Sequence, residues 1–307
     1  MSLHTLAKTD LQISNLCLGG NVFGWSADER QSHDVLNLYS ELGGNFIDTA
    51  DVYSEWGEGH VGGESESVIG SWLKNRASTD EVIIATKVSK LSTRPGLGRA
   101  NILAACDDSL RRLGRDHIDL YYAHDDDKDT PLEETMAAFT DLQQAGKIRF
   151  AAASNYTGAR LLEAAEISKQ HDLIEYSALQ NHYNLLEREE YERDSVDVLK
   201  QLGIEGVPFF GLARGFLSGK YREGVQVESV RAAGVTKYTN EHGWAVLAKL
   251  DRLANHHSVS LSAIALAWLR QQPSVAAPIA SARTVEQLRE IMTVVTLSAE
   301  EMDFLVG

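Results

Sequence analysis

The chain has 307 residues, of which 43% are hydrophobic and 24% charged, as in an ordinary globular protein, and its formal net charge is −15. This acidic balance argues against binding to nucleic acid or to an anionic membrane, and no apolar run approaches the ~20 residues that span a bilayer. Two lone cysteines, Cys17 and Cys106, offer neither a metal-binding spacing nor a disulfide framework, and the N-terminus lacks the pattern of a signal peptide. We therefore expect a cytoplasmic protein that binds no metal.

Short apolar runs alternate along the chain with longer amphipathic stretches. The first apolar run, at 13–18, ends in two glycines and predicts a strand. Hydrophobic residues at helical spacing predict a helix over 28–42, and the run at 45–48 predicts a second strand. A glycine-rich loop then leads into a predicted helix over about 64–74. Residues 81–88 (EVIIATKV) are dense in β-branched side chains and predict a third strand.

The same alternation continues to the end of the chain. Further strands are predicted at 118–124, 148–154, 177–183, 204–210 and 275–279. Further helices are predicted at 99–113, 131–145, 157–169, 189–202, about 240–256, 260–271 and 285–294.

Eight strand–helix units in this order indicate a parallel sheet of the α/β class. Eight units favour closure into a (β/α)8 TIM barrel, and counting alone leaves an open doubly wound sheet as the alternative. No linker or change in composition divides the chain, so we expect residues 1–307 to form a single domain. The longest irregular stretch, 213–237, is of a length that in compact domains is usually functional, for instance as a lid over the site.

Polar residues stand at the ends of the predicted strands, where (β/α)8 barrels carry their chemistry. Lys87 ends an apolar strand and needs a partner if it is buried, and Asp48 on the adjacent strand can supply one. A nearby ammonium favours the phenolate form of tyrosine, so we expect Lys87 to lower the pKa of Tyr53. An Asp–Lys–Tyr chain of this kind is a tunable proton donor, and His124 could donate a hydrogen bond to a substrate oxygen.

Each of these residues also has a structural explanation. Asp48 could be a turn residue, Tyr53 a packing aromatic side chain, and His124 the partner of one of the aspartates that follow it. The pair at 154–155 could cap the helix that begins near Thr157. Their joint position at successive strand ends favours a shared site.

Several segments of the sequence resemble the aldo-keto reductase family. NFIDTADVY at 45–53 resembles the signature in which the family carries its catalytic Asp and Tyr five residues apart. ATKV around Lys87 and IDLYYAH ending at His124 resemble the motifs of its catalytic Lys and His. The resemblance continues through GKIRFAAASNY, LQNHYNLLERE, GLARGFLSGKY and PIASARTVEQL, and so spans nearly the whole chain.

The resemblance implies an NAD(P)H-dependent carbonyl reductase. Tyr53 would be the general acid, Lys87 and Asp48 would tune it, and His124 would orient the carbonyl of a small aldehyde or ketone. The residues that the resemblance assigns to the cofactor are Gly20, Asn21, Ser154, Asn155, Gln180, Phe209, Leu212, Arg214, Lys220, Ser281, Arg283, Gln287 and Glu290.

Arg283 decides the expected cofactor. A guanidinium beside the start of the last predicted helix suits the 2′-phosphate, so we expect NADPH rather than NADH. Phe209 stands where the family often has a tyrosine that stacks on the nicotinamide, and it keeps the stacking face. Ile291 stands where the family often has an asparagine near the adenine, which weakens the expected contacts there.

The substrate pocket is expected to include Trp25, Trp56 and Asp125, although packing at an edge would also explain the tryptophans. The sequence leaves the identity of the carbonyl compound and the oligomeric state open. Two other functions also stay open. One is an NADPH-binding regulatory protein on the same scaffold, as in the potassium-channel beta subunits that resemble this family. The other is an NAD-dependent sugar dehydrogenase.

Overall fold

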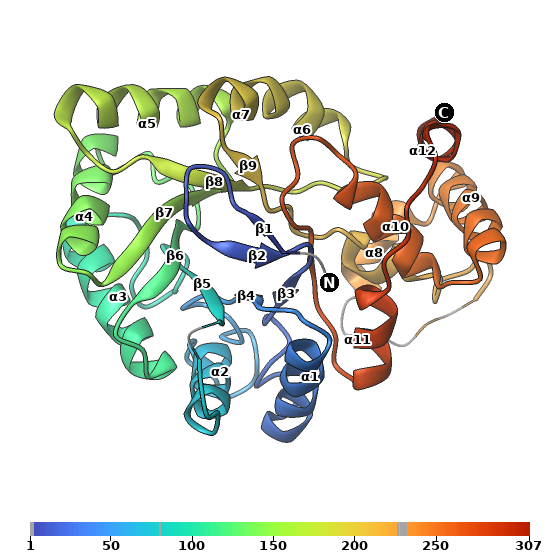
Figure 1. The fold of residues 1–307 in the computed structure, drawn as a ribbon, viewed down its shortest axis with the longest axis horizontal. Helices are drawn as coiled ribbons and strands as arrows, with labels where there is room; N and C mark the ends of the chain where they lie inside the picture. Colours follow the sequence, from blue (N-terminus) through green and yellow to red (C-terminus); the bar gives the residue numbers. More distant parts are fainter. Residues whose placement is uncertain (1–2, 80, 226, 228–231) are drawn as a thin grey trace.

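Eight parallel strands form the centre of the protein (Figure 1). The structure is a computed structural model that describes residues 3–79, 81–225, 227 and 232–307. In their order around the sheet, the strands are β10 (Ile279–Ala280), β3 (Cys17–Gly19), β4 (Phe46–Asp48), β5 (Ile83–Val88), β6 (Ile118–Ala123), β7 (Ile148–Ser154), β8 (Tyr176–Gln180) and β9 (Glu205–Gly206).

The sheet closes on itself through backbone hydrogen bonds next to its two end strands. The Gly206 N–H of β9 donates to Ser274 O at 2.7 Å, and the Ala276 N–H donates to Gly206 O at 2.8 Å. These bonds join β9 to the segment that leads into β10. The prediction of a (β/α)8 barrel is thus confirmed, and the open doubly wound sheet is excluded.

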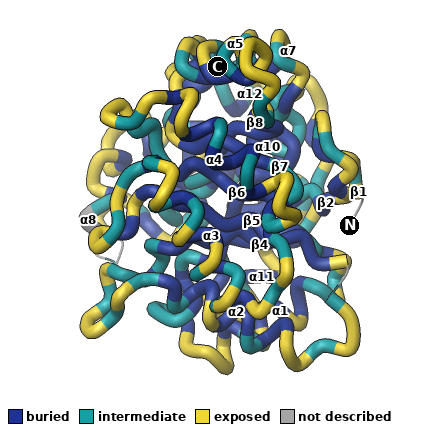
Figure 2. Tube along the Cα trace, turned by 90° about the vertical axis from the view of Figure 1, so that its left-hand side faces the viewer, coloured by how far each residue is buried: buried dark blue, intermediate teal, exposed yellow. Residues whose placement is uncertain are grey.

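Helices cover the outer face of the barrel (Figure 1). Those that follow the strands are α1 (Glu29–Glu41), α2 (Glu64–Lys74), α3 (Arg99–Leu113), α4 (Leu132–Gln144), α5 (Gly158–His171), α6 (Glu189–Asp194), α7 (Val196–Leu202), α9 (Glu241–His257), α10 (Leu261–Arg270) and α11 (Val285–Met292). Figure 2 shows the strands as buried segments within a shell of helices whose outer sides are exposed. Among the described residues, no helix has both the length and the apolar character needed to cross a membrane.

Alternation along each strand divides the core into two parts. On β5, Ile84 and Val88 pack under the helices, whereas Ile83 and Ala85 belong to a second cluster inside the barrel. Because side chains alternate with a period of two along a strand, this order decides which later residues face inward. Lys87, two residues beyond Ala85, therefore lies on the inner face.

A hairpin that the sequence did not reveal lies across one end of the barrel (Figure 1). The predicted strand at 13–18 is wrong, because its first part, β2 (Gln12–Ser14), pairs antiparallel with β1 (Leu3–Thr5) and only β3 belongs to the barrel. Ser14 interrupts the run, since its hydroxyl donates to Leu16 O at 3.0 Å and its N–H donates to the Asn45 side chain at 2.8 Å. Apolar side chains of the hairpin join the inner cluster and close this end: Leu6, Leu11 and Ile13.

Other predicted elements also need correction, among them the strands expected at 204–210 and 275–279, of which only β9 and β10 belong to the sheet. The helix expected over 189–202 is two helices, α6 and α7, separated at Ser195. The stretch 213–237 is less irregular than expected, because it contains the 3-10 turn η1 (Ala213–Ser218), the short helix α8 (Ala232–Val235) and the start of η2 (Thr236–Tyr238); its residues 226 and 228–231 lie outside the described part of the chain. A last helix, α12 (Ala299–Val306), was not predicted.

Candidate active site

Four polar side chains continue the inward-facing positions of four barrel strands. Phe46, Ala85, Tyr122 and Ala178 belong to the inner cluster, and the residue two positions later in each case is polar. Those later residues are Asp48, Lys87, His124 and Gln180. The strand register places them at one end of the barrel, since Asp48 pairs with Ala85 and Lys87 with Tyr122. The period-two pattern and the parallel register together bring the predicted residues to one place.

Lys87 is the centre of a hydrogen-bonded cluster. Its fully buried ammonium donates to Asp48 Oδ2 at 2.6 Å, to Thr49 O at 2.7 Å and to the Tyr53 hydroxyl at 3.0 Å. The Tyr53 hydroxyl donates to Asp48 Oδ2 at 3.1 Å, and Gln180 Nε2 donates to Asp48 Oδ1 at 2.8 Å. The partner that a buried lysine needs is therefore present, and the turn and packing explanations for Asp48 and Tyr53 do not account for these contacts.

The acid–base character of the cluster differs from expectation in one respect. Burial, followed by the Asp48 carboxylate, raises the pKa of Tyr53 well above its usual value, so the expected lowering by Lys87 is wrong. The carboxylate accepts the hydrogen bond of the neutral phenol and would repel a phenolate, and these effects outweigh the attraction of the ammonium. Burial also lowers the pKa of Lys87, while Asp48 opposes that change.

His124 lies beside Tyr53 and is neutral. The two ring centroids are 6.0 Å apart at an interplanar angle of 71°. Burial lowers the pKa of His124 well below its usual value, and Lys87 and Lys90 lower it further. Its Nδ1 atom is buried without a hydrogen-bond partner among the described residues, which leaves Nε2 as the ring nitrogen that can face a ligand.

Asp51 lies on the loop after β4, as Tyr53 does, but it takes no part in the hydrogen-bonded cluster around Lys87. It is 1% exposed, and neither of its carboxylate oxygens has a hydrogen-bond partner within the described chain. Burial, reinforced by the Glu66 carboxylate, raises the pKa of Asp51 to about 7, although Arg112 acts in the opposite direction. The Asp51 N–H donates to Lys87 O at 3.2 Å, so the loop after β4 is tied to β5 through its backbone.

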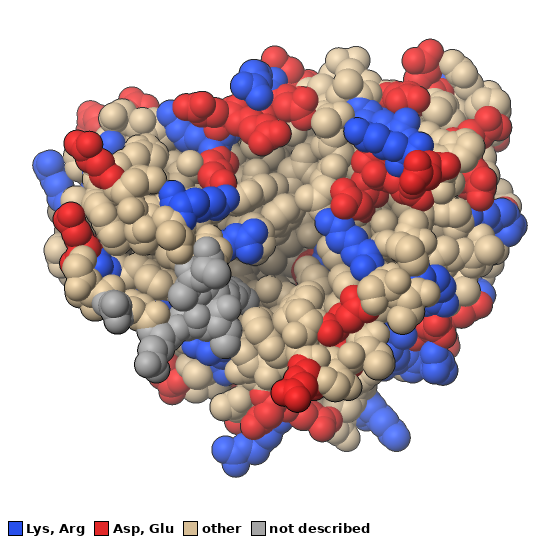
Figure 3. All heavy atoms as spheres, turned by 180° about the vertical axis from the view of Figure 1, so that it is seen from behind, with Lys and Arg blue, Asp and Glu red and all other residues tan. Residues whose placement is uncertain are grey.

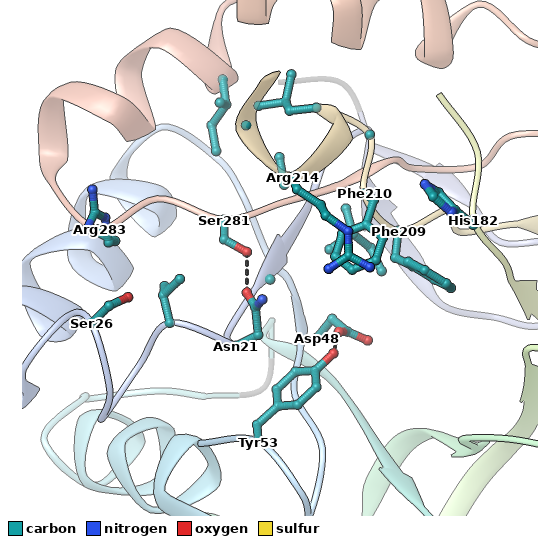
Figure 4. Close-up of a pocket in the computed structure, with 18 of the residues that line it drawn as sticks. Asn21, Ser26, Asp48, Tyr53, His182, Phe209, Phe210, Arg214, Ser281 and Arg283 are labelled. Atoms are coloured by element: carbon teal, nitrogen blue, oxygen red, sulfur yellow. Dashed lines mark hydrogen bonds between the residues drawn. The ribbon is translucent and has the colours of Figure 1, made fainter. Parts of the chain in front are cut away.

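A cavity of about 1100 Å³ opens over the cluster, and Figure 4 shows Tyr53 and Asp48 facing it together with side chains from the opposite wall. Asp48, Tyr53 and His124 line it, and Lys87 lies beneath them. Of the residues expected to hold the cofactor, those that line the cavity are Asn21, Ser154, Asn155, Gln180, Phe209, Leu212, Arg214, Lys220, Ser281, Arg283, Gln287 and Glu290. Gly20 is not in the lining; its N–H donates to Asp48 O at 2.7 Å, so it fixes the turn next to Asn21.

Hydrogen bonds hold several of these side chains in place. Asn155 Nδ2 donates to His124 O at 2.8 Å, and the Ser154 hydroxyl donates to Gln180 O at 2.9 Å. The helix-cap explanation for this pair is wrong, because Thr157 caps α5 by accepting from the Arg160 N–H. Elsewhere on the wall, the Ser281 hydroxyl donates to Asn21 Oδ1 at 2.6 Å, as Figure 4 shows.

An aromatic group that the sequence did not reveal surrounds Phe209. The His182 ring stacks on Phe209 with centroids 5.5 Å apart, and the Arg214 guanidinium lies 4.0 Å from the centroid of the Phe210 ring. His182 Nε2 also contacts Glu187 at 2.7 Å, and Glu187 contacts Lys237 beyond the long loop. In the sequence, only their position in or next to the segments that resemble the family could have pointed to these residues, because no periodicity distinguishes them from ordinary loop residues.

The residues expected in the substrate pocket are only partly in its lining. Trp56 lines the cavity, whereas Trp25 packs edge-on against Trp56 with ring centroids 5.6 Å apart. Asp125 is not in the lining of the cavity. Its carboxylate pairs at 3.1 Å with the ammonium of Lys90, and Lys90 does line the cavity. Sequence reasoning missed Lys90, although it stands only three residues after Lys87.

One group of metal-ligating side chains occurs elsewhere in the described chain. His256 and His257 at the end of α9 and Glu301 on α12 bring ligand atoms within 4.8 Å of one another. None of the three lines the cavity. The expectation of an active site without metal stays a prediction.

Comparison with known proteins identifies the class. Residues 15–306 match the model of the Aldo/keto reductase family. Protein tas of Escherichia coli is 32% identical over 317 residues, covering 94% of this chain and 91% of its own. The uncharacterized oxidoreductase YrpG of Bacillus subtilis is 32% identical over 310 residues, covering 98% and 93%. A putative voltage-gated potassium channel subunit beta of Schizosaccharomyces pombe is 30% identical over 304 residues, covering 93% and 85%.

The chain therefore belongs to the aldo/keto reductase family, and the resemblance seen in the sequence is confirmed. The family consists of oxidoreductases that act on small carbonyl compounds and generally use nicotinamide cofactors.

Proposed function

We propose that the protein reduces an aldehyde or a ketone with NADPH. The observation that carries the proposal is the position of Lys87, whose ammonium is 2.6 Å from Asp48 Oδ2 and 3.0 Å from the Tyr53 hydroxyl. This cluster lies below a cavity that His124 also lines. A phenol, an ammonium and a neutral imidazole around one space can protonate a carbonyl oxygen, and they form no nucleophile–base pair for covalent catalysis.

Tyr53 is the general acid in this proposal. Its hydroxyl turns from Asp48 towards the carbonyl oxygen and transfers its proton there, and general acid catalysis of this kind contributes about 10²–10⁴-fold. The phenolate that remains is stabilised by the Lys87 ammonium, whose own charge Asp48 balances. The raised pKa of Tyr53 keeps the phenol protonated at neutral pH, ready for the next turnover.

His124 orients the carbonyl. Because its pKa lies well below the usual value, the imidazole is neutral near pH ~7 and donates a hydrogen bond through Nε2 without adding a charge. The backbone of His124 is held by Asn155, whose side chain donates to His124 O. This bond fixes the backbone of His124 at the β6–β7 edge of the barrel.

The cavity wall suits a phosphorylated dinucleotide. Arg214, Lys220 and Arg283 line it in a chain whose net charge is −15. Arg283 precedes Thr284, the N-cap of α11, so a guanidinium and the positive end of a helix lie together. When bound, the cofactor would supply the hydride that attacks the carbonyl carbon. We assign to it Gly20, Asn21, Ser154, Asn155, Gln180, Phe209, Leu212, Arg214, Lys220, Ser281, Arg283, Gln287 and Glu290.

The test is aldehyde-dependent oxidation of NADPH by Tyr53→Phe. We expect kcat to fall by about 10²–10⁴-fold with little change in NADPH affinity, because the lost hydroxyl acts in proton transfer. The matched control is Tyr156→Phe, which makes the same change in a buried tyrosine outside the cavity lining and should keep its activity. Equal activity of Tyr53→Phe and wild type would contradict the proposal.

A second candidate is an NADPH-binding regulatory protein, which the similarity to the putative potassium channel subunit beta of Schizosaccharomyces pombe favours. Tight NADPH binding without turnover across a broad aldehyde panel would support it.

The alternative of an NAD-dependent sugar dehydrogenase predicts that Arg283→Ala leaves NADPH affinity unchanged. Our proposal predicts a marked loss of affinity for NADPH and little change for NADH.

We further propose that residues 1–307 work as one domain in the cytoplasm, which suits two buried free thiols.

A further inference from the structure

The charge around the cavity is opposite to that of the whole chain. Four cationic side chains line it: Lys90, Arg214, Lys220 and Arg283. The carboxylates in the lining are Asp48, which is already paired with Lys87, and Glu290. Figure 3 shows lysine and arginine side chains around a hollow in a surface that carries many acidic groups. A pocket of this kind attracts anions.

Three of these cations belong to the wall that we assign to the cofactor. Arg283 stands before α11 and the other two on the loop after β9, and Figure 4 shows Arg283 well apart from Tyr53 and Asp48. Lys90 has a different origin, because it follows β5 directly, three residues after Lys87. Its ammonium is 3.1 Å from the carboxylate of Asp125, the residue after His124, and the His124 N–H donates to Val88 O at 2.9 Å, two residues before Lys90. Lys90 therefore lies at the His124 end of the cavity, which both residues line.

The ammonium of Lys90 is not committed to a structural role. Its partner is Asp125, at 3.1 Å, and the two side chains are 35% and 48% exposed. Ion pairs between side chains this open to water add little to stability, so Lys90 can change partners at small cost. Asp125 itself is not in the cavity lining, so Lys90 is the member of the pair that a ligand would meet.

An aromatic surface faces the same end. Trp56 is 50% exposed although it is a large apolar side chain, and it lines the cavity. Trp25 supports it edge-on, and the Tyr53 ring lies 6.0 Å from it. A half-exposed ring that lines the cavity offers apolar surface to a planar ligand.

We propose that the substrates of this site are carbonyl compounds with an aromatic body and an anionic group, in which Trp56 contacts the body and Lys90 the anion. The proposal rests on the proposed reductase function and adds a substrate class to it. Lys90 is a specificity-determining residue here, and Asp125 opposes it by competing for the same ammonium.

The experiment compares 4-carboxybenzaldehyde with its neutral analogue 4-formylbenzamide. The ratio of their kcat/KM values is measured for wild type, Lys90→Met, Asp125→Asn and the control Lys128→Met. Lys128 is exposed on the loop after β6, so its substitution makes the same change in net charge outside the cavity lining.

We expect wild type to favour the carboxylate and Lys90→Met to lower the ratio by about tenfold, as charge-assisted contacts of this kind imply. Asp125→Asn should raise the ratio, because the competing carboxylate is removed, and Lys128→Met should leave it unchanged. An unchanged ratio in Lys90→Met, or a wild type that prefers the amide, would overturn the inference.

Calorimetric titration of the NADP-loaded protein with 4-carboxybenzaldehyde separates this inference from the reductase proposal. Binding that weakens in Lys90→Met but not in Lys128→Met supports the anion contact even if neither aldehyde is turned over, and that result would overturn only the reductase function. Equal binding by wild type and Lys90→Met would overturn the anion contact even if both aldehydes are reduced.

Discussion

Asp51→Asn should stabilise the protein in a way that depends on pH. The pKa of Asp51 is about 7 in the folded chain and 3.8 in the reference state, so the folded state holds its proton more tightly. The stability that this contributes is present below pH 3.8 and is lost as pH rises towards about 7. Of the range between about pH 5 and about pH 8, only the two pH units below the folded pKa of about 7 change the stability. At about 1.4 kcal/mol per pH unit, the loss over this range is about 3 kcal/mol. The asparagine amide does not ionise, so the variant avoids the loss.

The assay is urea unfolding of wild type and Asp51→Asn at both pH values. The difference in free energy of unfolding between the variant and wild type should favour the variant by about 3 kcal/mol more near pH ~8 than near pH ~5. Asp10→Asn is the matched control, because the Asp10 side chain is 74% exposed and its change should have little effect at either pH. A difference that is the same at both pH values would refute the reasoning, since it would show that buried Asp51 does not change its protonation over this range.

Three further outcomes follow from the geometry. His124 should stay neutral as pH falls from about 8 to about 6, so kcat should stay level there; a decline with a midpoint near 6.5 that disappears in His124→Gln would show that burial does not hold its pKa down. Glu187→Gln should speed release of NADP about two- to fivefold in stopped-flow measurements, because Glu187 pairs with Lys237 and contacts His182, which lines the cavity, at 2.7 Å; unchanged release would show that these contacts do not affect the cofactor. Gly70→Ala should lower the free energy of unfolding by about 1–3 kcal/mol or more, because a Cβ there would lie 2.1 Å from Arg112 O between α2 and α3; an unchanged denaturation midpoint would mean that the helices separate freely.

Much of the barrel could be read from the sequence because its strands are continuous apolar runs and its helices have regular hydrophobic spacing. The same signal failed at 13–18, where two short strands of different sheets follow one another without a change in hydrophobicity. It also failed at Ser195, where a helix is interrupted by a residue that tolerates a helical conformation. Hydrophobic periodicity follows the pattern of buried residues, and that pattern continues through both 13–18 and Ser195.

The candidate site shows a similar limit. Position at strand ends brought Asp48, Lys87 and His124 together correctly, because a parallel register is a simple geometric rule. The pKa of Tyr53 could not be derived this way, because its direction depends on whether burial and a carboxylate outweigh an ammonium at 3.0 Å. Lys90 was missed because a lysine on a loop is ordinarily solvated, and only the shape of the cavity sets it apart.

The N-terminal hairpin gives the molecule two ends of different character. Leu6, Leu11 and Ile13 close one end of the barrel with apolar side chains, while the cavity opens over the carboxyl ends of the strands. A linker joined at the N-terminal hairpin would therefore attach to the sealed end. Protein immobilised through such a linker would stand on a support with its entrance turned towards the solution, so orientation on a surface comes with the fold and needs no change at the mouth.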